Sequence, residues 1–165
     1  MIRVAILTVS DSCAAGTRED ISGPTIQEML PRKLFEMSEK RILPDDREAV
    51  AADLRRLADG EAVDLILTTG GTGLGPRDVT PEATISVCER MVPGFGEVMR
   101  IQGLTLTANA ALSRAVAGIR GRTLIVNLPG SAKAVRECLG LILRLLPHAI
   151  EMLRGGGHEP KEPCT

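Results

Sequence analysis

Residues 63 to 73 read VDLILTTGGTG, an apolar run that leads directly into three glycines within four residues. An apolar run without polar alternation is typical of a strand that is covered on both faces, as in a parallel sheet. Glycines at the end of such a strand predict a tight turn whose backbone another molecule can approach closely. The segment therefore predicts a buried strand from Val63 to Thr69 with a glycine loop at its carboxyl end.

Further strands are expected on both sides of this segment. Arg3 to Val9 and Arg122 to Leu128 are apolar or β-branched runs, and Lys40 to Leu43 is a candidate for a short edge strand. Helices are expected between and after the strands, where apolar residues recur at helical spacing beside start and stop signals. Their expected starts are Pro24, Asp46, the cap-then-proline pair Thr80-Pro81, Pro93 and Ser131, with stops or kinks at Pro31, Gly60 and Pro147.

Strands alternate with helices along the chain, and no segment is repeated. This order predicts an α/β fold with a mostly parallel sheet and helices on both faces. The length of 165 residues suits one domain, expected over residues 1–154, with a flexible C-terminal tail over 155–165. Ligands of such folds bind beyond the carboxyl ends of the strands. The polar and glycine-rich loops all follow strands, so we expect them to meet at one edge of the sheet: Ser10-Asp11, Pro44-Asp45, Thr69 to Asp78, and Asn127 to Ser131.

Composition disfavours two broad classes of partner. The chain has two Phe, no Tyr, no Trp and a formal net charge of −1, whereas single-stranded nucleic acid is held by aromatic stacking and a basic groove. No apolar stretch approaches the roughly 20 residues that span a bilayer. The N-terminal sequence MIRVAILTVSDS is expected to form the first strand rather than a signal peptide. We therefore expect a cytoplasmic protein that binds neither nucleic acid nor a membrane.

Cysteine and histidine chemistry is not expected. No CxxC pair occurs among the cysteines, which we expect to be reduced thiols: Cys13, Cys88, Cys138 and Cys164. His148 and His158 lack the spacing of a metal site or a catalytic triad, and no Ser lies in a G-x-S-x-G elbow. The reacting groups are therefore sought among the strand-end loops.

The loop from Thr69 to Asp78 has four glycines in six residues. It is not a Walker loop, because no Lys-Ser or Lys-Thr pair follows it. It is not a dinucleotide fingerprint either, because Pro76 stands where the third glycine would fall. A tight turn between strand and helix is the simplest interpretation. The density of glycines beside Thr, Arg and Asp favours a phosphate site built from successive N–H groups.

Two aspartates follow strand ends and could share this edge of the sheet. Asp45 and Asp78 would supply carboxylate oxygens beside a phosphate site, which is the environment in which Mg²⁺ is usually bound. Helix capping is the alternative for each residue, and Asp46 is the better candidate for a cap because it lies nearer the helix start.

Three other loops carry polar groups with more than one interpretation. Ser10-Asp11 is either a turn pair or a ligand contact. Ser113-Arg114 on its own suggests a solvated cap. The sequence NLPGSAK, residues 127–133, predicts a strand exit followed by a helix N-terminus, where Ser131 could cap the helix and the helix could also bind an anion.

Several blocks of the sequence resemble the molybdopterin adenylyltransferases, a family that includes a bacterial enzyme and the G domain of gephyrin. The blocks appear in the family's order and cover nearly the whole chain. They are LTVSDS (7–12), LPDD (43–46), TTGGTGLGPRDVTPEAT (68–84), MVPGFGEVMR (91–100), LSRAVAGIRGRTLIVNLPGS (112–131) and AVRECL (134–139).

The resemblance implies a three-layer α/β sandwich, a homotrimer, and Mg²⁺-dependent transfer of AMP from ATP to the terminal phosphate of molybdopterin, with release of pyrophosphate. It also implies hand-over of the product to a molybdenum insertase. Two essential aspartates of the family correspond to Asp45 and Asp78, which would act in catalysis and hold the metal. Residues of the nucleotide and molybdopterin pocket would be Ser10, Asp11, Gly70, Gly71, Thr72, Gly73, Glu97, Ser113, Pro129, Gly130 and Ser131.

The sequence departs from the family pattern in three places. Ala132 stands where relatives often have the proline of N-L-P-G-x-P, one more residue precedes Pro93 than in some relatives, and the chain stops soon after Leu153. The main alternative function is a trimeric paralogue that binds molybdopterin without transferring AMP. Longer molybdenum insertases, competence-damage-type pyrophosphatases and a gephyrin-like scaffold are disfavoured, because the chain is short and carries no further segments.

Overall fold

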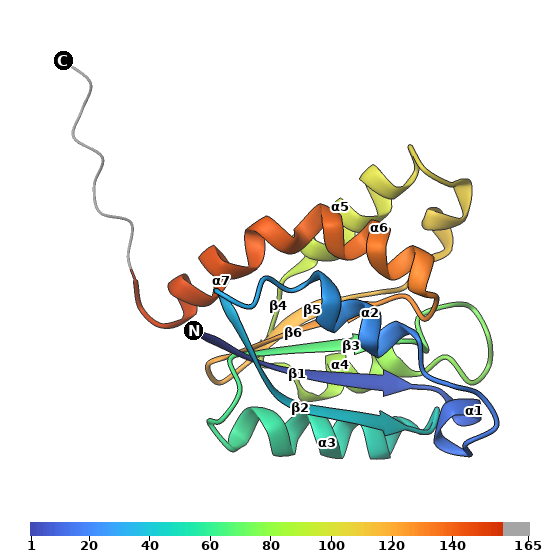
Figure 1. Cartoon of the computed structure of the whole chain (residues 1–165), viewed down its shortest axis with the longest axis horizontal. Coiled ribbons are helices and arrows are strands. Elements are labelled where there is room, and N and C mark those ends of the chain that lie inside the picture. Colours follow the sequence, from blue (N-terminus) through green and yellow to red (C-terminus); the bar gives the residue numbers. More distant parts are fainter. Residues whose placement is uncertain (157–165) are drawn as a thin grey trace.

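The computed structural model describes residues 1–156 as one six-stranded sheet flanked by helices (Figure 1). The strands are β1 (Ile2–Val9), β2 (Phe35–Leu43), β3 (Leu65–Thr69), β4 (Arg90–Met91), β5 (Ala117–Arg120) and β6 (Thr123–Leu128). The α-helices are α1 (Asp11–Ala14), α2 (Ser22–Met29), α3 (Arg47–Asp59), α4 (Thr80–Val87), α5 (Pro93–Gly103), α6 (Ala132–Ile142) and α7 (Leu146–Leu153). Two short 3₁₀ helices are η1 (Ala108–Leu112) and η2 (Leu143–Leu145).

The strand order across the sheet is β2-β1-β3-β6-β5-β4. The first four strands are parallel to one another, and β5 and β4 extend the sheet in antiparallel pairs. A two-residue turn joins β5 to β6, and its Gly121 has a φ of +55°, which glycine adopts without steric cost. The mostly parallel sheet predicted from the sequence is therefore confirmed, with an antiparallel edge that the sequence did not predict.

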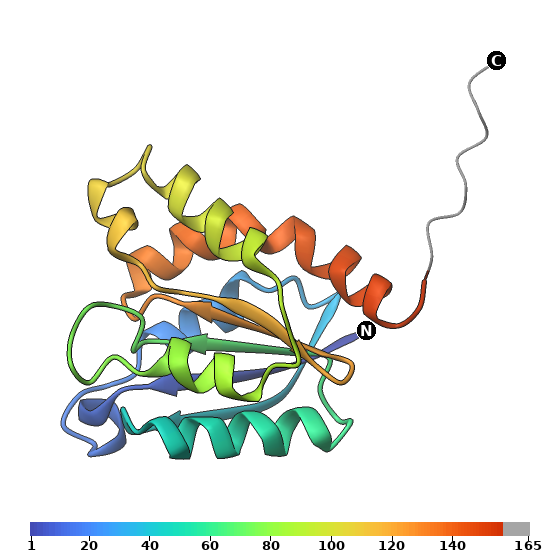
Figure 2. The ribbon, with the colours of Figure 1, turned by 180° about the vertical axis from the view of Figure 1, so that it is seen from behind.

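Two apolar layers cover the two faces of the sheet (Figures 1 and 2). Alternate residues of a strand point to opposite faces, and along β1 Val4 and Ile6 pack on one side while Ala5 and Leu7 pack on the other. Helices α2, α5, α6 and α7 cover the first face, and α3 and α4 cover the second (Figure 2). The three-layer sandwich is thus confirmed.

Several predicted boundaries shift for local reasons. Strand β2 begins at Phe35 rather than Lys40, because it pairs with β1 along its whole length. Helix α2 begins at Ser22 rather than Pro24, since the carboxylate of Asp20 accepts hydrogen bonds from the Ser22 hydroxyl and the Gly23 N–H, both at 3.0 Å. The loop expected over residues 10–23 also contains the single turn of α1.

The helix ends follow the predicted signals more closely. Asp46 caps α3 and Gly60 ends it. Thr80 is the first residue of α4 rather than its cap, and its hydroxyl donates to the Gly70 carbonyl at 2.8 Å. The break predicted near Pro147 is confirmed, because η2 separates α6 from α7.

The predicted tail at 155–165 lies almost wholly outside the described residues, which end at Gly156. Within residues 1–156, no helix combines the length and the hydropathy that a membrane span requires.

Candidate functional site

The carboxyl ends of the parallel strands form one edge of the molecule, beside α1 (right in Figure 1). A cavity of about 410 Å³ lies at this edge, between loops that follow β1, β2, β3 and β6. Seven of the predicted site residues line it: Ser10, Asp45, Gly70, Gly71, Asp78, Gly130 and Ser131. Residues from four distant parts of the sequence therefore meet here, as the parallel topology predicts.

A second cavity of about 560 Å³ adjoins the first. The two cavities share four lining residues: Gly71, Asp78, Gly130 and Ser131. The second cavity adds Thr72, Gly73, Ser113 and Pro129 from the predicted set. The glycine loop and the turn before α6 thus form a common wall between two neighbouring spaces.

Backbone geometry explains why glycine occupies the start of the loop. Gly70 and Gly71 have φ of +96° and +64°, in the left-handed region that residues with a side chain rarely adopt. A Cβ on Gly70 would collide with the Val9 carbonyl, and a Cβ on Gly71 would collide with the Thr80 hydroxyl. The loop can therefore lie this close to β1 and α4 only if both positions are glycine.

Four successive backbone N–H groups of the loop lack a protein acceptor. Among the described residues, the N–H groups of Gly71, Thr72, Gly73 and Leu74 donate to no carbonyl or side chain. All four residues line the second cavity. Unpaired donors in sequence form an anion-binding concavity, so the loop has the structure of a phosphate site.

Asp45 is held in place by a reciprocal pair of hydrogen bonds with Asp11. The carboxylate of Asp45 accepts from the Asp11 N–H at 2.7 Å, and the carboxylate of Asp11 accepts from the Asp45 N–H at 2.9 Å. Arg77 donates to both carboxylate oxygens of Asp11, at 3.0 and 2.9 Å. This hydrogen bonding from Arg77 lowers the pKa of Asp11. Asp11 therefore holds Asp45 in place but lines neither cavity itself.

The pKa of Asp45 is raised, chiefly because the carboxylate is partly removed from water. The negative charges of Asp11 and Asp78 raise it further, while the hydrogen bond from Asp11 opposes the shift. A cation bound beside Asp45 would offset this negative charge and favour the ionised carboxylate.

Asp78 closes the far end of the glycine loop. Its carboxylate accepts from the Gly75 N–H at 2.8 Å. An added Cβ on Gly73 or on Gly75 would lie 2.9 Å from the same carboxylate oxygen. A side chain at Gly73 or at Gly75 would therefore press on the Asp78 carboxylate and displace it.

The donor set fits Mg²⁺ better than a softer metal. The described residues contain no group of three or more His, Cys, Asp or Glu side chains that could hold a metal ion. Asp45 and Asp78 line one cavity beside the glycine loop, and Mg²⁺ is commonly held by one or two carboxylates, with water and substrate phosphates as the other ligands.

Neighbouring aspartates have separate tasks. The carboxylate of Asp46 accepts a hydrogen bond from the Ala49 N–H at 2.8 Å and caps α3, so Asp45 is left to face the cavity.

Ser131 caps α6 by accepting a hydrogen bond from the Ala134 N–H at 3.2 Å, and it also lines both cavities. The two interpretations of Ser131, as a helix cap and as part of an anion site, are therefore compatible in the structure.

Two predicted residues lie elsewhere or serve locally. Glu97 is exposed on α5 and lines neither cavity at this edge. Ser10 lines the first cavity, and its hydroxyl also caps α1 by accepting a hydrogen bond from the Cys13 N–H at 3.3 Å.

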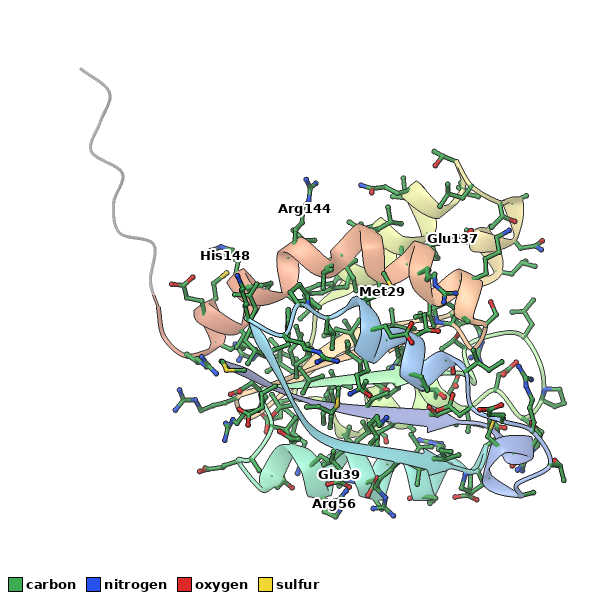
Figure 3. All side chains as sticks on the ribbon, in the orientation of Figure 1. Met29, Glu39, Arg56, Glu137, Arg144 and His148 are labelled. Atoms are coloured by element: carbon green, nitrogen blue, oxygen red, sulfur yellow. The ribbon has the colours of Figure 1, made fainter. Side chains whose placement is uncertain are left out.

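The histidines were not expected in the site. His148 lies on α7, at the end of the molecule opposite α1 (Figure 3), and His158 is outside the described residues.

The interpretation of Arg114 as part of a solvated cap is wrong. Its side chain is only 34% exposed and donates to the carbonyls of Gly73 and Asp78. Asp20 is a second residue that sequence reasoning missed; it lines the first cavity and accepts a hydrogen bond from Thr8 at 2.7 Å. The acceptors of Arg114 lie 41 and 36 residues away along the chain, so no local pattern reveals its contacts. Asp20 has local partners in Ser22 and Gly23, but its bond to Thr8 depends on how the loop folds back on β1.

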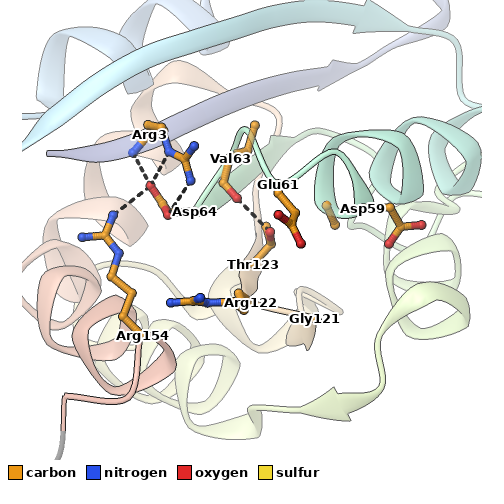
Figure 4. A pocket seen from close by; sticks show the side chains of 10 residues that line it. Arg3, Asp59, Glu61, Val63, Asp64, Gly121, Arg122, Thr123 and Arg154 are labelled. Atoms are coloured by element: carbon orange, nitrogen blue, oxygen red, sulfur yellow. Dashed lines mark hydrogen bonds and ion pairs between the residues drawn. The ribbon is translucent and has the colours of Figure 1, made fainter.

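A third cavity of about 520 Å³ lies at the opposite end of the sheet (Figure 4). Arg3 and Arg154 converge there on Asp64, which accepts from the Arg3 backbone at 2.8 Å and from both guanidinium groups at 3.0 Å. Burial opposes ionisation of Asp64, but these hydrogen bonds outweigh it and hold its pKa well below the usual range. The network ties β1 to the end of α7, and the cavity contains no glycine loop, so we do not take it as the active site.

Comparisons with known proteins agree with the geometry. The family model described as a probable molybdopterin binding domain matches residues 5–148. A molybdopterin adenylyltransferase from Helicobacter pylori (strain J99) is 43% identical over 156 residues, which cover 93% of this chain and 89% of that protein. The molybdopterin adenylyltransferase of Escherichia coli (strain K12) is 38% identical over 169 residues, covering 93% of this chain and 86% of that protein.

A solved structure extends the likeness to three dimensions. The crystal structure of the molybdopterin biosynthesis enzyme MoaB from Thermus thermophilus matches with a TM-score of 0.89 and 52% identity, over 94% of this chain and 98% of that one. The family model spans most of the sheet and both cavities at its carboxyl edge. The chain therefore belongs to the molybdopterin-binding family of molybdenum cofactor biosynthesis.

Proposed function

We propose that this protein is a molybdopterin adenylyltransferase, which transfers AMP from ATP to the terminal phosphate of molybdopterin and releases pyrophosphate. One observation carries the proposal: four N–H groups without an acceptor in residues 1–156 and two carboxylates line adjoining cavities at the carboxyl edge of the sheet. The relatives named molybdopterin adenylyltransferase, at 38% to 43% identity, support the same reaction.

The reaction joins two anions, so charge and alignment are the main obstacles. A phosphate oxygen of molybdopterin attacks the α-phosphorus of ATP, and the bond to the pyrophosphate oxygen breaks. The nucleophile is already ionised at neutral pH, so no general base is required. Holding the two phosphates in line and stabilising the charge that develops supply most of the rate enhancement in such transfers.

The residues of the site meet these needs. The N–H groups from Gly71 to Leu74 donate to phosphate oxygens, and the positive end of the 11-residue helix α6 faces the same space through Gly130 and Ser131. Two adjoining cavities with a common wall allow ATP and molybdopterin to bind side by side. Asp45 and Asp78 would hold Mg²⁺, which supplies neutralisation of the phosphate charge when it is bound.

The proposal also includes a homotrimer, a cytoplasmic location and hand-over of adenylylated molybdopterin to a molybdenum insertase. Apolar side chains that a trimer contact could bury are exposed on α5 and in the segment after it: Ile101, Leu104, Leu106 and Leu112. Glu97 lies on the same helix, so an interface on α5 would place it between subunits. The molar mass in solution, measured by light scattering, tests the trimer.

The decisive experiment measures pyrophosphate release from ATP in the presence of molybdopterin. We expect turnover by the wild-type protein and, for Asp78→Ala, a loss of at least about 1,000-fold in kcat with molybdopterin binding retained. Asp59→Asn is the matched control, because Asp59 pairs with Arg120 at the opposite end of the sheet. Near-normal turnover by Asp78→Ala would refute the assignment.

The same assay separates transfer from binding alone. The family model is described only by molybdopterin binding, and a paralogue that binds molybdopterin without chemistry is the second candidate. A wild-type protein that binds molybdopterin but releases no pyrophosphate from ATP would establish that second candidate and exclude the first.

A further inference from the structure

Arg114 binds the back of the glycine loop at three points. Its backbone N–H donates to the Thr72 carbonyl at 3.0 Å, its Nε to the Gly73 carbonyl at 2.7 Å, and a terminal nitrogen to the Asp78 carbonyl at 2.6 Å. One residue from the segment between η1 and β5 therefore holds the loop at both ends. A guanidinium has donors in a fixed planar fork, so these contacts set orientation as well as distance.

Glu82 fixes the guanidinium from the other side. It lies in the first turn of α4 and forms an ion pair with the remaining terminal nitrogen of Arg114. Burial raises the pKa of Glu82, but the hydrogen bond from Arg114, a backbone hydrogen bond and the nearby positive charges together outweigh burial, and the net shift is downward. Glu82 is therefore an anion at neutral pH, and it holds Arg114 against the loop.

These contacts determine which way the free N–H groups of the loop face. A trans peptide directs its N–H away from its C=O. The carbonyls of Thr72 and Gly73 point to Arg114, so the N–H groups of Gly73 and Leu74, which belong to the same two peptides, point away from it. Both N–H groups lack an acceptor among the described residues, and both residues line the second cavity.

We infer that Arg114 is a positioning residue for adenylyl transfer, which with Glu82 orients the glycine loop and Asp78 toward the substrates. Arg114 lines neither of the cavities that share the loop, so its effect passes through the backbone that it holds. This inference rests on the proposed function, since it names the group that aligns the phosphate site of that reaction.

The test compares Arg114→Met, Arg114→Lys and Glu82→Gln with the control Arg120→Met. Arg120 is a fair match because it also pairs with a carboxylate, that of Asp59 at 2.7 Å, and donates to a backbone carbonyl, that of Val87 at 3.1 Å. For Arg114→Met we expect kcat to fall about 100-fold while KM for ATP changes less than about threefold, because misalignment affects the transition state more than binding. Arg120→Met should keep the wild-type kcat.

Hydrogen exchange gives a readout that does not depend on turnover. The N–H groups of Gly75, Asp78 and Thr80 are bonded within the loop. Their exchange should be at least about tenfold faster in Arg114→Met and unchanged in Arg120→Met, because only the first variant releases the loop. Unchanged exchange in Arg114→Met would overturn the inference.

The conservative variants distinguish geometry from charge. Arg114→Lys keeps the charge but cannot bind three acceptors in one plane, so it should remain impaired; a wild-type kcat in this variant contradicts the inference. Glu82→Gln should lower kcat by a smaller factor, about 3- to 10-fold, since the hydrogen bond weakens without the charge. If Arg114→Met does not fold, these two variants decide the matter.

The outcomes also separate this inference from the proposed function. A wild-type protein without turnover, whose loop exchanges faster only in the Arg114 variants, refutes adenylyl transfer and supports the orientation of the loop. An active wild-type protein whose kcat is unaffected by all three Arg114 and Glu82 variants supports adenylyl transfer and overturns the positioning role.

Discussion

Gly71 meets three structural requirements of the candidate site at once. Its φ of +64° is strained for any side chain, and an added Cβ would meet the Thr80 hydroxyl and approach the Asp45 carboxylate to 3.3 Å. The residue lines both cavities, and its N–H is unpaired among residues 1–156. Backbone freedom, close packing and ligand access therefore all require glycine at this position.

Gly71→Ala should lower stability and abolish activity. The left-handed conformation costs about 1 to 2 kcal/mol for alanine, and the contacts of the new methyl group displace the loop as well. Gly16→Ala is the matched control, because Gly16 has a φ of +72° and nothing lies within 4 Å of the added Cβ. Urea unfolding and pyrophosphate release measure the two effects; equal behaviour of the two variants would show that the contacts with Thr80 and Asp45 do not matter.

At the scale of elements, the turn between β2 and α3 separates two tasks between adjacent aspartates. Asp46 completes the first turn of α3, whereas Asp45 is drawn back against Asp11 and faces the cavity. The hydrogen bond that caps the helix fixes the chain direction at this point. The same local geometry therefore stabilises α3 and aims the catalytic candidate.

Asp46→Ala should cost about 1 kcal/mol of stability through the lost cap and leave kcat within about threefold of wild type. Asp45→Ala should do the reverse, with little change in unfolding free energy and a loss of activity comparable to that of Asp78→Ala. Thermal unfolding and steady-state kinetics of the two variants check this division. A large loss of kcat in Asp46→Ala would mean that the two carboxylates share one task.

Elements whose signals are local were predictable from the sequence. Strand β3 and its glycines, the capped start of α3 and the break at Pro147 all depend on neighbouring residues. Strands β4 and β5 were not, because they have only two and four residues, and β4 is paired with a strand nearly 30 residues further along the chain. The contacts of Arg114 were also not predictable, because its acceptors lie about 40 residues away along the chain.

At the scale of the whole molecule, the candidate site and an ion-pair network lie at opposite ends of the sheet. The glycine loop and the aspartates lie at the carboxyl end, and the ion-pair network of Asp64 with Arg3 and Arg154 lies at the amino end (Figure 4). That network joins the first strand to the segment that follows α7. It therefore connects the two ends of the described chain.

The contribution of Asp64 to stability should depend on pH. Its folded-state pKa is below the unfolded value of about 3.9, so the stabilisation is complete above that value and is lost as the pH falls through the folded pKa. Asp64→Asn should cost about 1 to 3 kcal/mol at about pH 7, and the difference from wild type should shrink below about pH 4. Chemical unfolding between about pH 2.5 and about pH 7, a range that brackets the unfolded pKa, checks this; a constant difference would contradict it.

The two edges of the sheet have a consequence for how copies of the chain meet. An open strand edge invites pairing with another chain, which leads to aggregation. Here one edge, β4, is only two residues long. The other, β2, has a register shift opposite Val4 and Ala5 and carries the charged side chains of Glu36, Glu39, Lys40 and Arg41. Both features discourage extension of the sheet at its margins, and they protect the folded chain from edge-to-edge aggregation.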